Sequence, residues 1–252
     1  MRLFFAALPV TLVFAIAAHA ANVQTVIARP QLRVQSADYR ATGHLVRVDA
    51  SGARTSYAIA LKARGFPDGL RVLLDIVSPK DARAHVLLEM RRNSQMTIQI
   101  AHPGDASPVT VPFDMWNDGP LGAGFSYEDF LEPQYFWKSQ TLLQATKYGE
   151  RECDVLKSTP SRSERTHYAE VRTWLDQSIG YPVYVEKTLK KTGMVKEFTY
   201  FGLRQNSGVW SASQVEVKTR GHAGSTLLII DRGSAKANLD LREFSPEQLV
   251  HF

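Results

Sequence analysis

The sequence has a single cysteine, Cys153, among its 252 residues. A disulfide bond within the chain is therefore impossible, whatever the redox state of the compartment. The fold has to be stabilised by packing, and we expect the thiol to be buried as a small apolar side chain.

The excess of positive over negative charge is also small. The formal net charge is only +5, and the lysines and arginines are scattered, with Arg91-Arg92 and Lys190-Lys191 as the densest pairs. Aromatic residues do not alternate with these cations as they do in nucleic-acid-binding proteins, so we expect no nucleic-acid partner. The basic excess indicates an ordinary solvated surface or, as the alternative, attraction to anionic membranes.

The one long apolar run lies at the amino terminus. Arg2 precedes an almost wholly apolar stretch from Leu3 to Ala17, and Ala18-His19-Ala20 provides the small-x-small pattern that a signal peptidase requires. The run is shorter than the ~20 residues of a membrane-spanning helix. The sequence therefore predicts a cleaved signal peptide at 1–20 and an exported mature domain at 21–252.

Motifs for catalysis and metal binding are missing as well. The stretch GPLGAG (119–124) has the glycines of a phosphate loop but no Lys-Ser/Thr after it, and Glu128 stands where a Gly-x-Ser-x-Gly elbow needs its last glycine. The histidines are dispersed without ligand spacing, so we expect no metal and no other cofactor. A hydrolase that uses Asp118, Glu128 or Glu132 is an alternative to a protein without enzymatic activity.

What the chain does contain is a series of short alternating runs from Asp38 onward, separated by turn signals. Such a series is typical of an antiparallel meander in a sandwich or barrel. The runs cover 38–49, 56–64, 70–77, 85–92 and 95–101 in the first half, and 153–158, 168–176, 181–190, 195–203, 209–219 and 225–232 in the second. Residues 138–150 can be helical, and Asn22 to Ala37 is expected to form only a weak helix because Pro30 interrupts it.

The first-half strands each have one apolar and one polar face. A sheet of this kind has to cover its apolar face with its own barrel interior, with helices or with a bound apolar ligand. The apolar faces carry Tyr57, Ile59, Leu61, Leu70, Val72, Leu74, Ile76, Val86, Leu88, Met90, Met96, Ile98 and Ile100.

The segment 114–137 between the two halves combines glycines with large apolar side chains. Ser126 stands as a helix N-cap with Asp129 as its capping-box partner, and Phe125 with Phe130 forms a hydrophobic staple. A second helix start recurs at Ser245. Side chains this apolar do not face water, so the segment is expected to cover the apolar face of the sheet. They are Met115, Trp116, Leu121, Phe125, Phe130, Leu131, Phe136 and Trp137.

The order of these elements resembles the LolA-like family of periplasmic lipoprotein-sorting and lipid-carrier proteins. The resemblance runs from about Asp38 to Phe252 through the early meander, GAGFSYEDF, YGERECDVLKSTP, the later strands and the closing FSPEQL. It implies a mainly β fold with short helices, in which a half-open antiparallel β-barrel surrounds an apolar cavity under a helical lid. The apolar strand faces would then line a lipid cavity, and the apolar residues of 114–137 would form the lid.

The function that the resemblance implies is a carrier in the periplasm, not an enzyme. Such a carrier shields the acyl chains of lipoprotein or lipid on the way to the outer membrane, as a monomer with transient membrane contact. Its partners would be an inner-membrane exporter and an outer-membrane acceptor. An arginine on an early strand would hold the lid shut, and Arg40, Arg47 and Arg64 are the candidates. The alternative is a non-carrying sensor or accessory module of the same fold that docks onto a membrane export complex.

Overall fold

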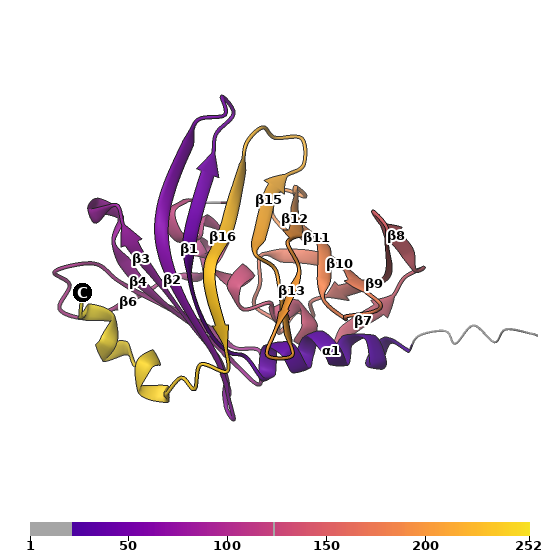
Figure 1. Cartoon of the computed structure of the whole chain (residues 1–252), viewed down its shortest axis with the longest axis horizontal. Helices are drawn as coiled ribbons and strands as arrows, with labels where there is room; N and C mark the ends of the chain where they lie inside the picture. Colours follow the sequence, from indigo (N-terminus) through magenta and orange to yellow (C-terminus); the bar gives the residue numbers. More distant parts are fainter. Residues whose placement is uncertain (1–21, 123) are drawn as a thin grey trace, which may run out of the picture.

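Two runs of antiparallel strands meet along the pair β1–β16 and form one 14-stranded sheet (Figure 1). The computed structural model describes residues 22–122 and 124–252, so the predicted signal peptide lies outside the described residues. The first run holds β1 (Asp38–Val48), β2 (Arg54–Phe66), β3 (Gly69–Ser78), β4 (Ala84–Arg91), β5 (Met96–Ala101) and β6 (Val109–Thr110). The second holds β16 (Ser225–Ala235), β15 (Gln214–Thr219), β12 (Val195–Phe201), β11 (Pro182–Leu189), β10 (Tyr168–Asp176), β9 (Arg151–Thr159), β7 (Ser139–Leu142) and β8 (Thr146–Tyr148).

The sheet curls without closing. Its path ends at β6 on one side and at β7 on the other, and no ladder joins these two edges among the described strands. The half-open antiparallel barrel expected from the sequence is confirmed. The strand register places one apolar row on the inner face, because Leu61, Leu74, Val86 and Ile100 are successive cross-strand partners from β2 to β5.

Short 3-10 segments cover the concave side of the first run. They are η2 (Phe113–Asp118), η3 (Pro120–Gly122), η4 (Tyr127–Phe130) and η5 (Pro133–Phe136), while η1 (Lys80–Ala82) joins β3 to β4. The N-cap role of Ser126 is confirmed, since η4 begins directly after it and Asp129 Oδ2 accepts a hydrogen bond from the Ser126 backbone N–H at 2.7 Å. The expected helix is a single 3-10 turn, because Pro133 follows three residues after its end.

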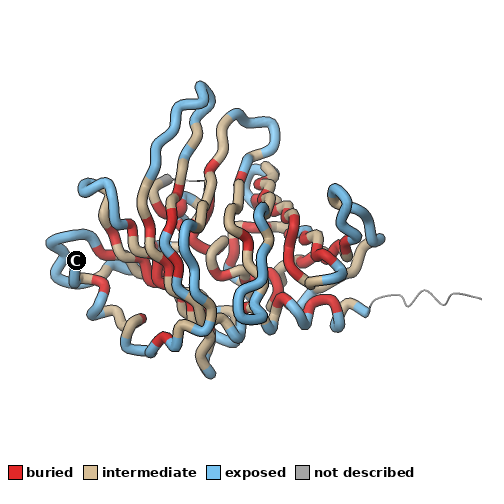
Figure 2. The backbone as a smooth tube through the Cα atoms, in the orientation of Figure 1, coloured by how far each residue is buried: buried red, intermediate tan, exposed pale blue. Residues whose placement is uncertain are grey.

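The opposite face of β3–β5 is covered by the end of the chain. Segments η6 (Leu241–Phe244) and η7 (Pro246–Val250) carry Phe244 and Leu249 onto Leu73 and Leu87 in a second buried cluster. The outer face of these strands is therefore partly apolar, although its polar positions had suggested a solvated surface. Figure 2 shows buried residues in the middle of the molecule and exposed residues at the hairpin tips.

Helix α1 (Val23–Gln35) is a 13-residue helix, so the helix expected between Asn22 and Ala37 is confirmed, but it continues through Pro30 without the expected interruption. Pro30 costs the helix one hydrogen bond, but its ring is buried together with Val26, Ile27 and Val34. Packing on this one face therefore outweighs the local penalty. No helix within 22–122 and 124–252 has the length and apolarity needed to cross a membrane.

Two further expectations need correction. Residues 138–150 form the short strands β7 and β8 instead of a helix, because both pair with β9. The run 209–219 is two strands, β14 (Val209–Ser211) and β15, since the chain turns at Ala212 and Ser213. Among the described strands, β14 pairs only with β13 (Arg204–Asn206), and the two form a separate two-stranded sheet.

Candidate functional site

A cavity of about 680 Å³ lies between helix α1, the inner face of the sheet and the β13–β14 hairpin. Strands β1–β3 supply one apolar wall, with Tyr39, Leu61, Leu70 and Val72. Alternate residues of a strand point to the same face, so the even spacing that makes each strand amphipathic also turns these side chains inward.

The facing wall comes from strands of the second run. Phe198 and Tyr200 on β12, Val215 on β15, and Leu228 and Ile230 on β16 line it. Phe125 and Phe130 close the inner end, with their ring centroids 5.7 Å apart, so the staple predicted from the sequence forms part of the cavity surface. The cavity is thus mainly apolar and within the size range of small-molecule sites.

One buried ion pair is set into this apolar surface. Lys187 Nζ lies 2.8 Å from Asp129 Oδ1, and both residues line the cavity. The Tyr168 hydroxyl donates a hydrogen bond to the same carboxylate oxygen at 2.8 Å and lies 3.0 Å from the Ser126 hydroxyl. Asp129 therefore ties the η4 turn to strands β10 and β11.

Burial and charge oppose each other at this pair. Burial raises the pKa of Asp129, but the charges of Lys187 and Lys196 outweigh it and hold the pKa below the ordinary value. Burial, with the charges of Asp129 and Glu128, raises the pKa of the Tyr168 hydroxyl well above its usual range. The Asp129 carboxylate is therefore charged at neutral pH, and Tyr168 is a neutral donor.

A second ion pair joins helix α1 to the segment that follows η4. Arg33 Nη2 lies 2.9 Å from Glu132, and its guanidinium lies 5.1 Å from the centre of the Tyr181 ring. Glu132 has a φ of 49°, a left-handed conformation that is unusual for this residue type. The ion pair with Arg33 provides the compensating contact.

Glu128 is fully buried beside these groups. Its carboxylate accepts hydrogen bonds from the Thr166 hydroxyl and, at 3.0 Å, from the His167 backbone N–H. The carboxylates of Glu128, Asp129 and Glu132 are all engaged by protein donors, and their contacts hold the segment in place.

Residues 71–251 match the model of a protein family whose description is "Uncharacterized protein". The chain belongs to this family. No curated protein matches the sequence.

Solved structures identify the fold. A domain of an outer membrane lipoprotein-sorting protein from Vibrio parahaemolyticus is 19% identical, with a TM-score of 0.81 over 91% of this chain and 100% of that one. A DUF1329 family protein from Desulfovibrio piger is 14% identical, with a TM-score of 0.80 over 90% of this chain and 98% of that one. A LolA superfamily protein from Nitrosomonas europaea is 15% identical, with a TM-score of 0.71 over 91% of this chain and 100% of that one. The LolA-like resemblance is confirmed at the level of the fold.

Within this LolA-like fold, three of the predicted lining residues reach the cavity: Leu61, Leu70 and Val72. The others pack elsewhere on the apolar face, mostly beneath the 3-10 segments. The side chains buried in one cluster with these segments are Ile59, Leu74, Val86, Leu88, Met90 and Ile98. Partly buried side chains that pack against this cluster are Tyr57, Met96 and Ile100. Ile76 is buried but does not belong to the cluster. Their role in lipid binding stays a prediction.

The predicted lid residues are mostly core residues. Trp116, Leu131 and Trp137 are buried, Leu121 and Phe136 pack against the same cluster, and only Met115 is largely exposed. Phe125 and Phe130 alone face the cavity. A loop-like sequence with this many apolar residues can fill a core, and the sequence pattern does not distinguish a plug from a movable cover.

Of the three arginine candidates, Arg47 is the one with a hydrogen bond to the described part of the 114–137 segment. Its Nη1 donates to the Leu121 carbonyl at 3.3 Å, whereas Arg40 pairs with Glu243 and Arg64 with Asp38. The stronger tie to this segment is Arg33 on α1, which the strand-based expectation missed. The Arg33–Glu132 contact spans 99 positions, and no local sequence signal indicates it.

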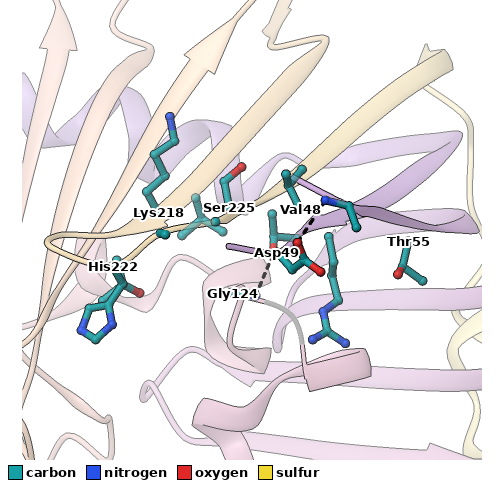
Figure 3. Close-up of a pocket in the computed structure, with 14 residues that line it drawn as sticks. Val48, Asp49, Thr55, Gly124, Lys218, His222 and Ser225 are labelled. Carbon is teal, nitrogen blue, oxygen red and sulfur yellow. Dashed lines mark hydrogen bonds between the residues drawn. The ribbon is translucent and has the colours of Figure 1, made fainter. Parts of the chain in front are cut away.

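A smaller cavity of about 310 Å³ lies at the other end of β1, between the β1–β2 and β15–β16 hairpins (Figure 3). Its lining includes Asp49, Lys218 and His222. Gly124 approaches strand β16 here, and its N–H donates to the Thr226 hydroxyl at 3.0 Å. A side chain at Gly124 would meet Val217 Cγ1 at 2.9 Å, so this glycine allows a close approach of segment and sheet.

Proposed function

We propose that the protein is a periplasmic carrier that shields an acyl chain of lipoprotein or lipid cargo in its 680 Å³ cavity. The observation that carries the proposal is the lining of that cavity, which is mainly aliphatic and aromatic. Each methylene moved from water into such a lining contributes about 0.8 kcal/mol. One acyl chain therefore supplies several kcal/mol without specific polar contacts.

The LolA-like fold supports the same proposal, because a structural neighbour is a domain of a lipoprotein-sorting protein. The proposal includes residues 1–20 as a cleaved signal peptide, 21–252 as one carrier domain, and a monomeric carrier without enzymatic activity. It also includes transfer from an inner-membrane exporter towards an outer-membrane acceptor.

Native mass spectrometry of protein purified from its host tests the proposal. We expect a bound species with the mass of a lipid or acylated peptide, and we expect a fluorescent fatty-acid probe to compete with it. Protein that brings no lipid from cells and binds no acyl probe would refute a carrier.

A matched pair of variants assigns the binding to this cavity. Val215→Trp places a large ring in the cavity and is expected to weaken probe binding at least tenfold, because the ring occupies the volume of the chain. Val77→Trp makes the same change at an exposed position of β3 outside the cavity. Equal binding by both variants would place the acyl site elsewhere.

A further inference from the structure

Two apolar side chains lie at the mouth of the large cavity. Leu32 on α1 and Val209 at the turn of the β13–β14 hairpin both line the cavity. Their exposed fractions are nevertheless 64% and 41%. Residues that line a cavity and face solvent mark its opening, so helix α1 and the β13–β14 hairpin border the mouth on two sides.

The charges around this mouth do not balance. The carboxylates that line the cavity are each neutralised within the protein, Asp38 by Arg64 at 2.6 Å, Asp129 by Lys187 and Glu132 by Arg33.

Three exposed cations on the same lining have no carboxylate partner among the residues at 22–122 and 124–252. Arg29 donates only to the neutral carbonyl of Gln177 at 2.9 Å, and no salt bridge includes Arg204 or Lys236. They come from α1, β13 and the residue after β16, so they surround the mouth from three elements.

We infer that the mouth docks on the surface of an anionic lipid bilayer. Leu32 and Val209 enter the boundary between head groups and acyl chains, while Arg29, Arg204 and Lys236 contact lipid phosphates. Apolar side chains flanked by basic ones are the pattern that proteins use to lie on a membrane without crossing it. In this orientation the cavity opens towards the bilayer, so an acyl chain can pass between membrane and cavity without crossing water.

The docking requires no bound cargo, whereas its purpose rests on the proposed carrier function. The two are therefore tested by separate measurements, vesicle binding for the docking and acyl-probe binding in vesicle-free solution for the carrier. Protein that binds the probe but no vesicles would overturn the docking alone.

The experiment is co-sedimentation of the mature protein with vesicles of phosphatidylcholine, alone or mixed with phosphatidylglycerol. We expect binding to the anionic vesicles only, weakening as salt shortens the Debye length from about 10 Å to about 3 Å. Each cation at an anionic surface is worth about a fivefold change in affinity, so Arg204→Ser with Lys236→Ser should weaken binding about 25-fold. Leu32→Ser with Val209→Ser should weaken it roughly fivefold, through lost apolar insertion.

The charge control is Lys190→Ser with Lys191→Ser, which removes the same charge at the exposed turn after β11, at the strand end remote from the cavity residue Tyr181. This variant is expected to bind vesicles like the unmodified protein. If the Lys190→Ser, Lys191→Ser variant lost as much vesicle binding as the Arg204→Ser, Lys236→Ser variant, the attraction would come from overall charge and the docking surface would be overturned. Loss of probe binding without vesicles in Arg204→Ser with Lys236→Ser would assign these cations to the cargo and overturn it as well.

Discussion

Lys187 and Asp129 form an ion pair of 2.8 Å in which both side chains are almost completely buried, at 3% and 2% exposure. Lys196 is the direct cross-strand neighbour of Lys187 and is also buried, with no salt-bridge partner among the described residues. Asp129 thus pairs with Lys187 in the wall of the cavity, and its charge also acts on the buried Lys196.

Replacing Asp129 by Leu should destabilise the protein by about 3–5 kcal/mol, because Lys187 is left as an uncompensated buried charge. Chemical denaturation followed by tryptophan fluorescence measures this loss. The double variant Asp129→Leu with Lys187→Met should recover part of it, since Lys187 no longer leaves an unpaired buried charge, whereas Lys196 still lacks the nearby charge of Asp129. A double variant as unstable as the single one would show that packing around η4, not charge, sets the penalty.

The same ion pair predicts a dependence on pH. The pKa of Asp129 is lower in the folded state than its ordinary value of 3.8. Its contribution is therefore complete above about pH 4 and is lost as the pH falls through the folded-state pKa. Unfolding free energies measured from about pH 6 to about pH 3 should fall less steeply for the Asp129→Leu, Lys187→Met double variant than for the unmodified protein. Parallel curves would contradict this assignment.

Lys196→Met should stabilise the protein by about 1 kcal/mol at neutral pH, because a buried like charge opposite Lys187 disappears. Burial lowers the pKa of Lys196, so the penalty belongs to the protonated form and shrinks as the pH rises towards the ordinary value of 10.5. Thermal unfolding at neutral and alkaline pH checks both statements. The exposed Lys190→Met is the matched control and should change little.

Arg33 should matter more than Arg47 for holding the 114–137 segment. Arg33→Ala removes the ion pair with Glu132 and the contact with Tyr181, and it should cost about 2 kcal/mol and speed release of a bound acyl probe. Arg47→Ala removes one solvent-exposed hydrogen bond to the Leu121 carbonyl and should leave both quantities nearly unchanged. The reverse order would make Arg47 the latch that the family resemblance implies.

Cys153 should be inert in the folded protein. The side chain is fully buried, and burial raises the pKa of its thiol, so little reactive thiolate is present at neutral pH. A chromogenic thiol reagent is expected to react only as denaturant unfolds the chain, with the midpoint seen by fluorescence. Rapid labelling of folded protein would show that strand β9 opens locally.

Alternation and turn chemistry made most strands predictable. Tyr57, Ile59 and Leu61 alternate with small or polar residues because one face of β2 is buried, and the same logic located β1, β3, β4 and β5. The N-cap at Ser126 was predictable for a similar reason, since its partner Asp129 lies only three residues away. Local signals of this kind predict the folded structure correctly because the interacting groups are neighbours in the chain.

Helix α1, strands β7 and β8 and the β13–β14 hairpin were not predictable in this way. Pro30 lowers the helix propensity of α1, and only burial against the rest of the chain compensates. Residues 138–150 contain the strands β7 and β8 because both form backbone hydrogen bonds with the edge of β9. In each case a partner distant in the sequence outweighs local propensity.

The sequence by itself determined that the chain forms amphipathic antiparallel strands, that one face needs a cover, and that the segment 114–137 is apolar enough to supply it. Only the tertiary structure decided that this segment fills the core over Leu88 and Ile98, and that the cavity opens instead between α1 and the β13–β14 hairpin. The reason is physical: periodicity states which face of a strand leaves water, but packing between distant segments decides whether protein or a cavity occupies that face.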